Sequence, residues 1–236
     1  MANLDYEQKL NSKPYRFFDQ VYRLLVLNVI TIILSATLIG MFPAFVATTA
    51  TLKQGNQMNV FKQFIKNFLH YFKKSFFVGL ILFFVYSVNI YAFYFYATSV
   101  VEDVQDFDWT LLFVNAGFIV SIVMFIVITL LSVHLPLLII TFESLTVKET
   151  YRTSLYVSIR YIITTLILFV LQVLIIGSFI YCMVDPRFLA VWLLVGISLP
   201  VFLQVKFTTA VYYKLSQIDF EQIMYKVEDE EDESDE

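Results

Sequence analysis

Five long stretches of this chain contain no Asp, Glu, Lys or Arg, and they limit its fold more than any other feature. They are residues 24–52, 75–101, 109–142, 161–184 and 188–205. Each reaches the ~18 residues that mark a candidate membrane span. The backbone of a spanning segment must satisfy its own hydrogen bonds, and continuous hydrophobicity without alternation excludes a β-barrel. We therefore expect an all-α, polytopic transmembrane bundle of about five hydrophobic helices.

Composition separates a membrane domain from an acidic tail. The 236 residues are 59% hydrophobic and 15% charged, which is too apolar for a soluble domain. We expect residues 1–215 to form a single transmembrane domain and residues 216–236 to form a cytoplasmic tail. All of residues 228–236 except Ser234 are acidic. Such a run is typical of a disordered, solvated tail, whereas the remaining basic body suits loops that lie against anionic lipid.

Two prolines predict breaks in the hydrophobic runs. Because proline breaks or kinks a helix, one span should end near Gly40, just before Pro43. Residues 43–52 then either continue past a kink or turn back as a half-helix. The run 109–142 is too long for one straight span, so we expect Pro136 to bend its end into the membrane interface.

Two basic amphipathic segments lie between the hydrophobic runs. The first has Phe61, Phe64, Ile65, Phe68 and Phe72 at helical spacing, and the second has Val147, Tyr151, Leu155 and Ile159. The pattern predicts two helices lying in the headgroup layer. We expect these side chains to lie at the membrane interface: Lys62, Lys66, Lys73, Lys74, Arg152 and Arg160.

The order of segments suggests an internal repeat and an orientation. Each half consists of an apolar run, a proline, a basic amphipathic segment and a second apolar run. This order suggests a diverged parallel duplication plus a fifth helix, and the alternative is that the similarity is a coincidence. Residues 102–108 carry acidic but no basic side chains and should be external, so the basic segments and the C-terminus should be cytoplasmic. The side of the N-terminus stays open between five full spans and four spans plus a re-entrant segment.

Three ionisable residues in or beside the hydrophobic runs are ligand candidates. His134 lies two residues before Pro136, where a structural role is favoured over a proton or ligand role. Glu143 falls on the opposite face of an unbroken helix, so the two cannot form a pair unless Pro136 bends the chain. Lys206 either neutralises Glu143, lines a pathway or, as is commoner, extends to the cytoplasmic interface.

Four uncharged amides lie within the hydrophobic runs: Asn28, Asn89, Asn115 and Gln172. They either contact a polar solute or, as is commoner in membrane bundles, form hydrogen bonds between helices. Small residues, such as Ala36 with Gly40, are spaced for close helix packing. No group of His, Cys or acidic residues has metal-ligand spacing, and no catalytic motif occurs. We therefore expect no enzyme activity, no metal or other cofactor and no nucleic-acid partner.

Short motifs resemble the YesL-like family of bacterial integral membrane proteins, which occurs mainly in Gram-positive bacteria and has no established biochemical activity. They are Leu27-Asn28, Gly40-Met41-Phe42-Pro43-Ala44, Phe72-Lys73-Lys74-Ser75 and His134-Leu135-Pro136-Leu137-Leu138, within residues 15–215. Thr48-Thr49-Ala50 departs from the Ala-rich pattern expected there. The resemblance transfers no catalytic residues, and it implies a link to carbohydrate uptake.

The expected function follows from this resemblance. We expect a plasma-membrane accessory or regulatory component that contacts the lipid bilayer and a transporter permease or membrane sensor subunit. The alternative is a small secondary transporter acting alone, which the apparent repeat, the broken helices and the buried amides would suit. The sequence leaves the solute and the oligomeric state open.

Overall fold

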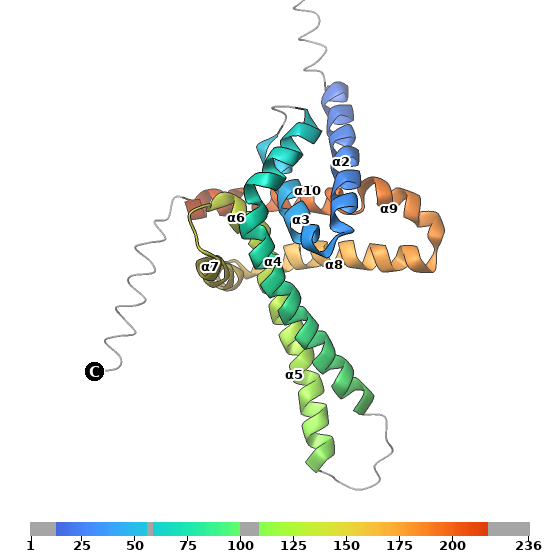
Figure 1. Ribbon diagram of the computed structural model, residues 1–236, viewed down its shortest axis with the longest axis vertical. Helices are drawn as coiled ribbons and strands as arrows, with labels where there is room; N and C mark the ends of the chain where they lie inside the picture. The colour runs from blue at the N-terminus through green and yellow to red at the C-terminus, as the bar shows by residue number, and fades with distance from the viewer. Residues whose placement is uncertain (1–12, 56–58, 100–108, 217–236) are drawn as a thin grey trace, which may run out of the picture.

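The computed structural model in Figure 1 describes residues 13–55, 59–99 and 109–216. Every regular element in these ranges is a helix, so the all-α prediction is confirmed. The helices are α2 (Lys13–Ser35), α3 (Leu38–Gln54), α4 (Val60–Ser99), α5 (Trp109–Ser132), α6 (Leu135–Thr141), α7 (Val147–Arg160), α8 (Ile162–Val184), η1 (Pro186–Phe188), α9 (Leu189–Val195) and α10 (Ser198–Ser216). Among the described residues, four helices are long and apolar enough to cross a membrane, and the bent run from η1 to α10 makes five. The acidic loop 102–108 and the tail 217–236 lie outside these residues.

Two short helices, α3 and α6, lie at the centre of the bundle. Residues 46–51 of α3 and residues 135–140 of α6 are all buried. Val46 packs in one hydrophobic cluster with Leu135 and Ile139, so the two helices touch each other. The long helices α2 and α4 and the last helix α10 also contact α3 (Figure 1). A helix buried on all sides needs such neighbours, because it has no polar face to present to solvent.

The chain reverses between α2 and α3 at residues 36–37. The Thr37 side chain caps α3 by accepting a hydrogen bond from the Gly40 N–H at 3.2 Å. A Cβ on Gly40 would lie 2.4 Å from the Leu34 carbonyl oxygen, so this glycine permits the tight turn rather than a helix-to-helix contact. The first span therefore ends at Ser35, and the prediction that it ends near Gly40 was wrong. Pro43 lies inside α3, because the threonine cap, not the proline, sets the boundary.

Helix α3 runs antiparallel to α2. The Thr31 and Thr48 hydroxyls form a hydrogen bond at 2.5 Å. Arg23, which precedes Thr31 in α2, donates from its guanidinium to the carbonyl oxygen of Thr51, which follows Thr48 in α3. Residues 43–52 therefore turn back along α2, which is one of the two alternatives that the sequence left open.

Helix α4 joins the first amphipathic segment to the following hydrophobic run. It has 40 residues. At ~1.5 Å per residue its length is about 60 Å, twice a ~30 Å membrane core. Its buried face includes Gln63, Phe64, Asn67 and Tyr71, while Phe61 is exposed. The prediction of a separate interfacial helix here was wrong, because no proline or cap interrupts residues 60–99.

The run 109–142 breaks before Pro136, and its last part stays in the core. Pro136 lies in the first turn of α6, which is buried between other helices. The prediction that this proline bends the chain into the membrane interface was therefore wrong. Hydroxyl groups of α7 explain why the break is tolerated inside the protein. Ser154 donates to the Leu131 carbonyl oxygen at 2.6 Å and Ser158 to that of Leu130 at 3.1 Å, so carbonyls at the end of α5 are satisfied.

The second amphipathic segment is a separate helix, α7, as the sequence predicts. It begins with a capping box, in which Thr146 and Glu149 bond each other's backbone N–H groups. Its buried face is made of small polar residues such as Thr153 and Ser154, whereas Leu155 and Ile159 are exposed. The exposed side of α7 therefore carries apolar side chains beside the basic Lys148, Arg152 and Arg160.

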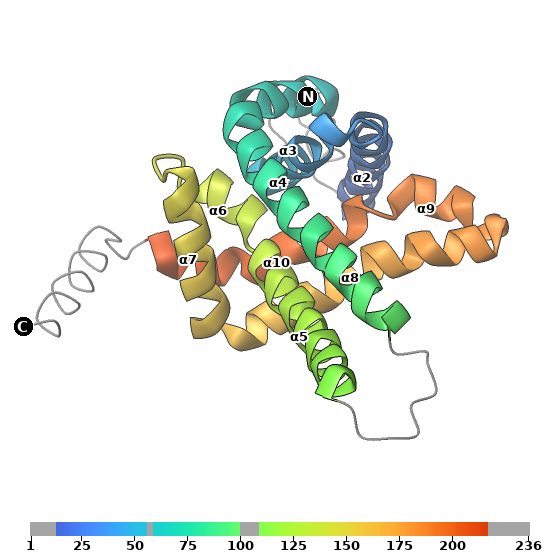
Figure 2. The same ribbon diagram turned by 60° about the horizontal axis from the view of Figure 1, so that its bottom comes forward.

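Figures 1 and 2 show two groups of helices that run in crossing directions. Helices α4 and α5 extend together from the body, while α8, α9 and α10 run across them. Both groups expose large hydrophobic side chains, including Phe84, Phe113 and Ile163. One bilayer normal cannot lie along both groups, so at least one group must be steeply tilted where both contact lipid.

The two halves of the chain share one feature of the predicted repeat. In each half a long helix is followed by a shorter helix that contains a buried proline. They differ afterwards, because residues 60–74 continue into α4 whereas α7 and α8 separate at Tyr161. The superposition of residues 24–100 on 111–184 stays a prediction.

Candidate functional site

A polar pocket of about 510 Å³ lies between the end of α3, the first half of α4 and the turn between α6 and α7. Its lining residues are Gln54, Gln63, Lys66, Asn67, His70, Tyr71 and Glu143. This volume is in the range of small-molecule sites, which run at roughly 300–1,000 Å³. All seven lining side chains carry a polar group.

Amide side chains build the floor of the pocket. Gln54 Oε1 accepts hydrogen bonds from Gln63 Nε2 at 3.0 Å and from Asn67 Nδ2 at 3.1 Å. Asn67 Nδ2 also donates to the Thr51 hydroxyl at 3.0 Å, and Arg23 donates to Gln63 Oε1 at 3.1 Å. These bonds use the donors of Asn67, whose side chain is only 5% exposed, and they orient its Oδ1 acceptor.

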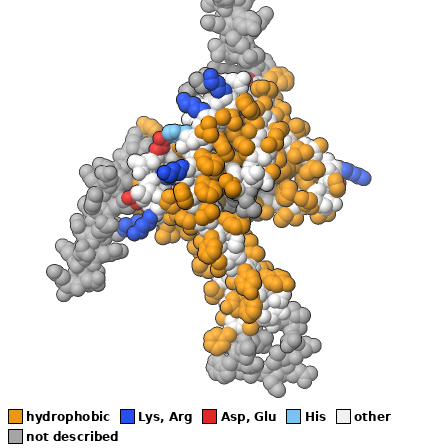
Figure 3. All heavy atoms as spheres, viewed as in Figure 1, with side chains coloured by type: hydrophobic (Ala, Val, Ile, Leu, Met, Phe, Trp, Pro, Cys, Tyr) orange, Lys and Arg blue, Asp and Glu red, His pale blue; other side chains and the backbone are white. Residues whose placement is uncertain are grey.

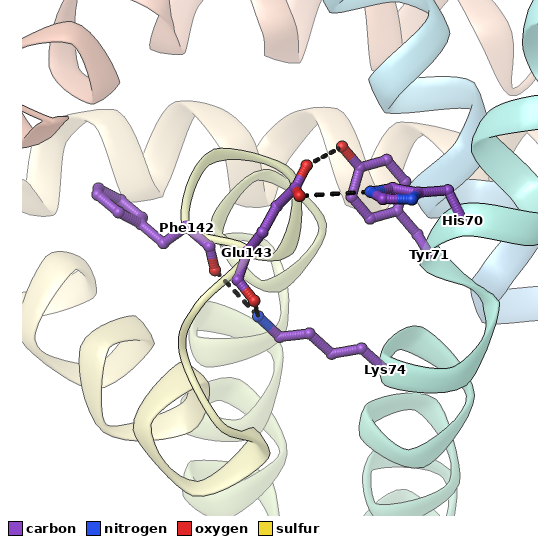
Figure 4. A network of polar contacts seen from close by, with 5 residues as sticks. All are labelled: His70, Tyr71, Lys74, Phe142 and Glu143. Carbon is purple, nitrogen blue, oxygen red and sulfur yellow. Dashed lines mark hydrogen bonds and ion pairs between the residues drawn. The ribbon is translucent and has the colours of Figure 1, made fainter.

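Glu143 forms the opposite wall, and three residues of α4 hold it there (Figure 4). Its Oε1 accepts from the Tyr71 hydroxyl at 2.8 Å, and its Oε2 lies 3.3 Å from His70 Nε2. The Lys74 ammonium donates to the backbone oxygens of Phe142 at 3.0 Å and Glu143 at 3.3 Å. A cation at the end of α6 also complements the partial negative charge of its last carbonyls. The α6–α7 turn is thus fixed to α4.

The hydrogen bond from Tyr71, with smaller contributions from His70 and Lys74, lowers the pKa of the Glu143 carboxyl. The carboxylate therefore stays ionised well below neutral pH. The His70 and Glu143 side chains are 58% and 57% exposed, so the ion pair itself adds little stability.

Among the ionisable candidates, His134 does not line this pocket. Its side chain is fully buried at the break between α5 and α6. Its Nδ1 lies 2.9 Å from the Tyr212 hydroxyl and its Nε2 lies 2.8 Å from the Thr165 hydroxyl. It thus joins α6 to α8 and α10. Because both ring nitrogens have protein partners, the geometry favours packing over ligand binding.

Lys206 does not approach Glu143. Its ammonium lies 4.7 Å from the centre of the Phe202 ring, one turn earlier on α10. It is exposed, which fits the alternative in which it extends outward.

Asn28 connects α2 to the break between α9 and α10. Its Nδ2 donates to the carbonyl oxygens of Trp192 at 3.1 Å and Leu193 at 2.8 Å. Its Oδ1 accepts from the backbone N–H groups of Ile197 at 2.8 Å and Ser198 at 2.9 Å. One amide thus satisfies both helix ends, and the predicted single run 188–205 is a pair bent by 45°.

The other three amides lie away from the pocket. Gln172 Oε1 accepts from Gln204 Nε2 at 3.4 Å, between α8 and α10. Asn89 Nδ2 donates to the Ser121 carbonyl oxygen at 3.3 Å, between α4 and α5. Asn115 is exposed on α5. Three of the four amides therefore join helices.

Of the side chains expected at the membrane interface, five are exposed and Lys74 is half-buried. The exposed five are Lys62, Lys66, Lys73, Arg152 and Arg160. Figure 3 shows most Lys and Arg side chains of the drawn face over α4 and α7, and hydrophobic side chains over most of the remainder.

Sequence reasoning found Glu143 and Lys66 but missed the amide floor. A signal was present, because Gln63, Asn67 and Tyr71 recur every four residues and so share one face of α4. The regular Phe and Lys pattern around them concealed this polar stripe. Gln54 carried no comparable signal, because its contribution depends on how α3 folds back.

Fold and hydropathy together define a multi-pass, all-α membrane protein. No family model, curated protein or solved structure matches the chain. The resemblance to the YesL-like family thus stays a prediction.

Proposed function

We propose that this protein is a plasma-membrane accessory or regulatory component linked to carbohydrate transport, and that its polar pocket binds a small hydroxyl-rich solute. The pocket is the observation that carries this proposal. An amide side chain both donates and accepts hydrogen bonds, as a hydroxyl group does. Asn67, Gln54 and Lys66 all line the pocket, and their side chains include both hydrogen-bond acceptors and donors. The link to carbohydrate rests on the family resemblance.

The proposed topology places the basic helices and the C-terminus in the cytoplasm. Exposed basic side chains on α4 and α7 support it, because cytoplasmic loops are enriched in Lys and Arg. A transporter permease or sensor subunit is the proposed partner.

A second candidate, a secondary transporter acting alone, is favoured by the two short helices at the centre of the bundle. Residues 46–51 of α3 and residues 135–140 of α6 are buried, both helices contain proline, and the two helices touch each other. Discontinuous helices that meet in the core form the solute sites of many secondary transporters.

Sugar uptake in cells tests the proposal. A deletion strain is complemented with the wild type, with Asn67→Leu or with Asn115→Leu, which removes an exposed amide from α5 in the same way. We expect wild type and N115L to restore uptake and N67L to fail, with equal amounts of protein in the membrane. Unchanged uptake after deletion would refute a transport role. Sugar uptake by vesicles that contain only the purified protein would favour a secondary transporter over an accessory component.

A further inference from the structure

The exposed side of α7 is a basic surface. Lys148, Arg152 and Arg160 are all exposed on this helix. Its one acidic residue, Glu149, is engaged in the capping box, where Thr146 donates to it from both the backbone N–H at 2.6 Å and the hydroxyl at 2.8 Å. The outward face of α7 therefore carries a net positive charge.

The end of α10 is packed close to this surface. Leu215 is fully buried in a hydrophobic cluster that includes Val157 of α7 and Leu138 of α6. The chain therefore leaves the described bundle at Ser216 beside α7. Lys214, in the last turn of α10, is exposed and adds a further positive charge nearby.

The remaining chain has the length and the charge to cover this surface. Eight acidic residues occur in residues 228–236, twelve residues beyond Ser216. Twelve residues can span up to about 40 Å, whereas the 14 residues of α7 extend over only about 21 Å. Tethering gives the acidic run an effective concentration near α7 on the order of millimolar.

We propose that residues 228–236 dock on the basic face of α7 in the same molecule. Each exposed ion pair contributes little, so binding depends on several pairs acting together and weakens as salt screens them. The docked tail covers a surface that would otherwise attract anionic lipid headgroups or an acidic partner. The α7 face is thus available to them only when the tail is displaced.

Zero-length crosslinking with a carbodiimide tests this proposal, because the reagent joins a carboxylate to a lysine amine only when the two are in contact. The full chain in phosphatidylcholine nanodiscs, which contain no anionic lipid, is crosslinked at 50 mM and 500 mM NaCl. Peptides are identified by mass spectrometry. We expect a crosslink between Lys148 and residues 228–236 at low salt, and its loss at high salt.

Charge variants provide the control. The double variant Arg152→Gln, Arg160→Gln should lower the yield of this crosslink about threefold, as expected for losing two exposed attractions. Arg187→Gln, on η1 at the far end of α8, should leave it unchanged. Each variant must keep the wild-type melting temperature. If the double variant melts at a lower temperature, the single variant Arg160→Gln takes its place.

Three results would overturn the proposal. The first is the absence of the Lys148 crosslink in the wild type at low salt. The second is a yield that is equal in the α7 and Arg187 variants. The third is a crosslink that joins only light to heavy chains in an isotopically mixed sample, because the tail would then dock on a second copy.

Discussion

Replacing Asn28 by leucine tests whether one side chain stabilises the break between α9 and α10. The variant removes four hydrogen bonds and leaves two carbonyl oxygens and two N–H groups without their partner. Hydrogen bonds between membrane helices contribute roughly 0.6 kcal/mol each on average, so the loss should be about 2 kcal/mol. For a chain of this size that corresponds to a fall in Tm of about 4–8 °C.

Trp192 makes the assay local, because it lies at this break and its carbonyl oxygen accepts a hydrogen bond from Asn28 Nδ2. The chain has two tryptophans, so a Trp109→Phe background leaves Trp192 as the only one. Thermal unfolding in mild detergent is followed by its fluorescence. Asn115→Leu is the matched control and should shift Tm little, since that amide is exposed. A fall in Asn28→Leu no larger than in the control would refute the reasoning.

Two further predictions concern the contacts of α4. Because Tyr71 lowers the pKa of Glu143, the carboxylate contact should stabilise the protein fully above the ordinary pKa of 4.5 and lose this effect as pH falls through the lower folded value. Glu143→Gln should thus lower Tm at pH 6 and reduce the fall in Tm that the wild type shows as the pH becomes acidic. Plots of Tm against pH that run parallel for the wild type and the variant would contradict this. A Cβ on Gly79 would lie 2.5 Å from Phe42 Cβ, so Gly79→Ala should cost roughly 1–3 kcal/mol in the free energy of unfolding. A Cβ on Gly177 would have no atom within 4 Å, so Gly177→Ala should be neutral or stabilising by up to about 1 kcal/mol. Denaturant titrations measure both changes. Equal losses of stability in the Gly79 and Gly177 variants would argue against close packing as the cause.

Some features of the site could be predicted from sequence patterns, and others could not. Exposed lysines and the separate helix α7 were predictable, because amphipathic spacing is a local property. The pocket was not, because it needs Gln54 from α3, Asn67 from α4 and Glu143 from the α6–α7 turn in one place. His134 and Asn28 were recognised as unusual, yet their partners lie 31 to 78 and 164 to 170 residues away along the chain.

The sequence by itself determined that this is a helical membrane protein, because the length of an uncharged apolar run decides whether a segment can cross a bilayer. It also indicated that the runs are broken near prolines. Only the tertiary structure decided where each break lies and which broken helices are buried. The physical reason is that a break frees backbone groups that must find partners, and those partners come from distant elements: Asn28 for α9 and α10, Ser154 for α5 and Lys74 for α6.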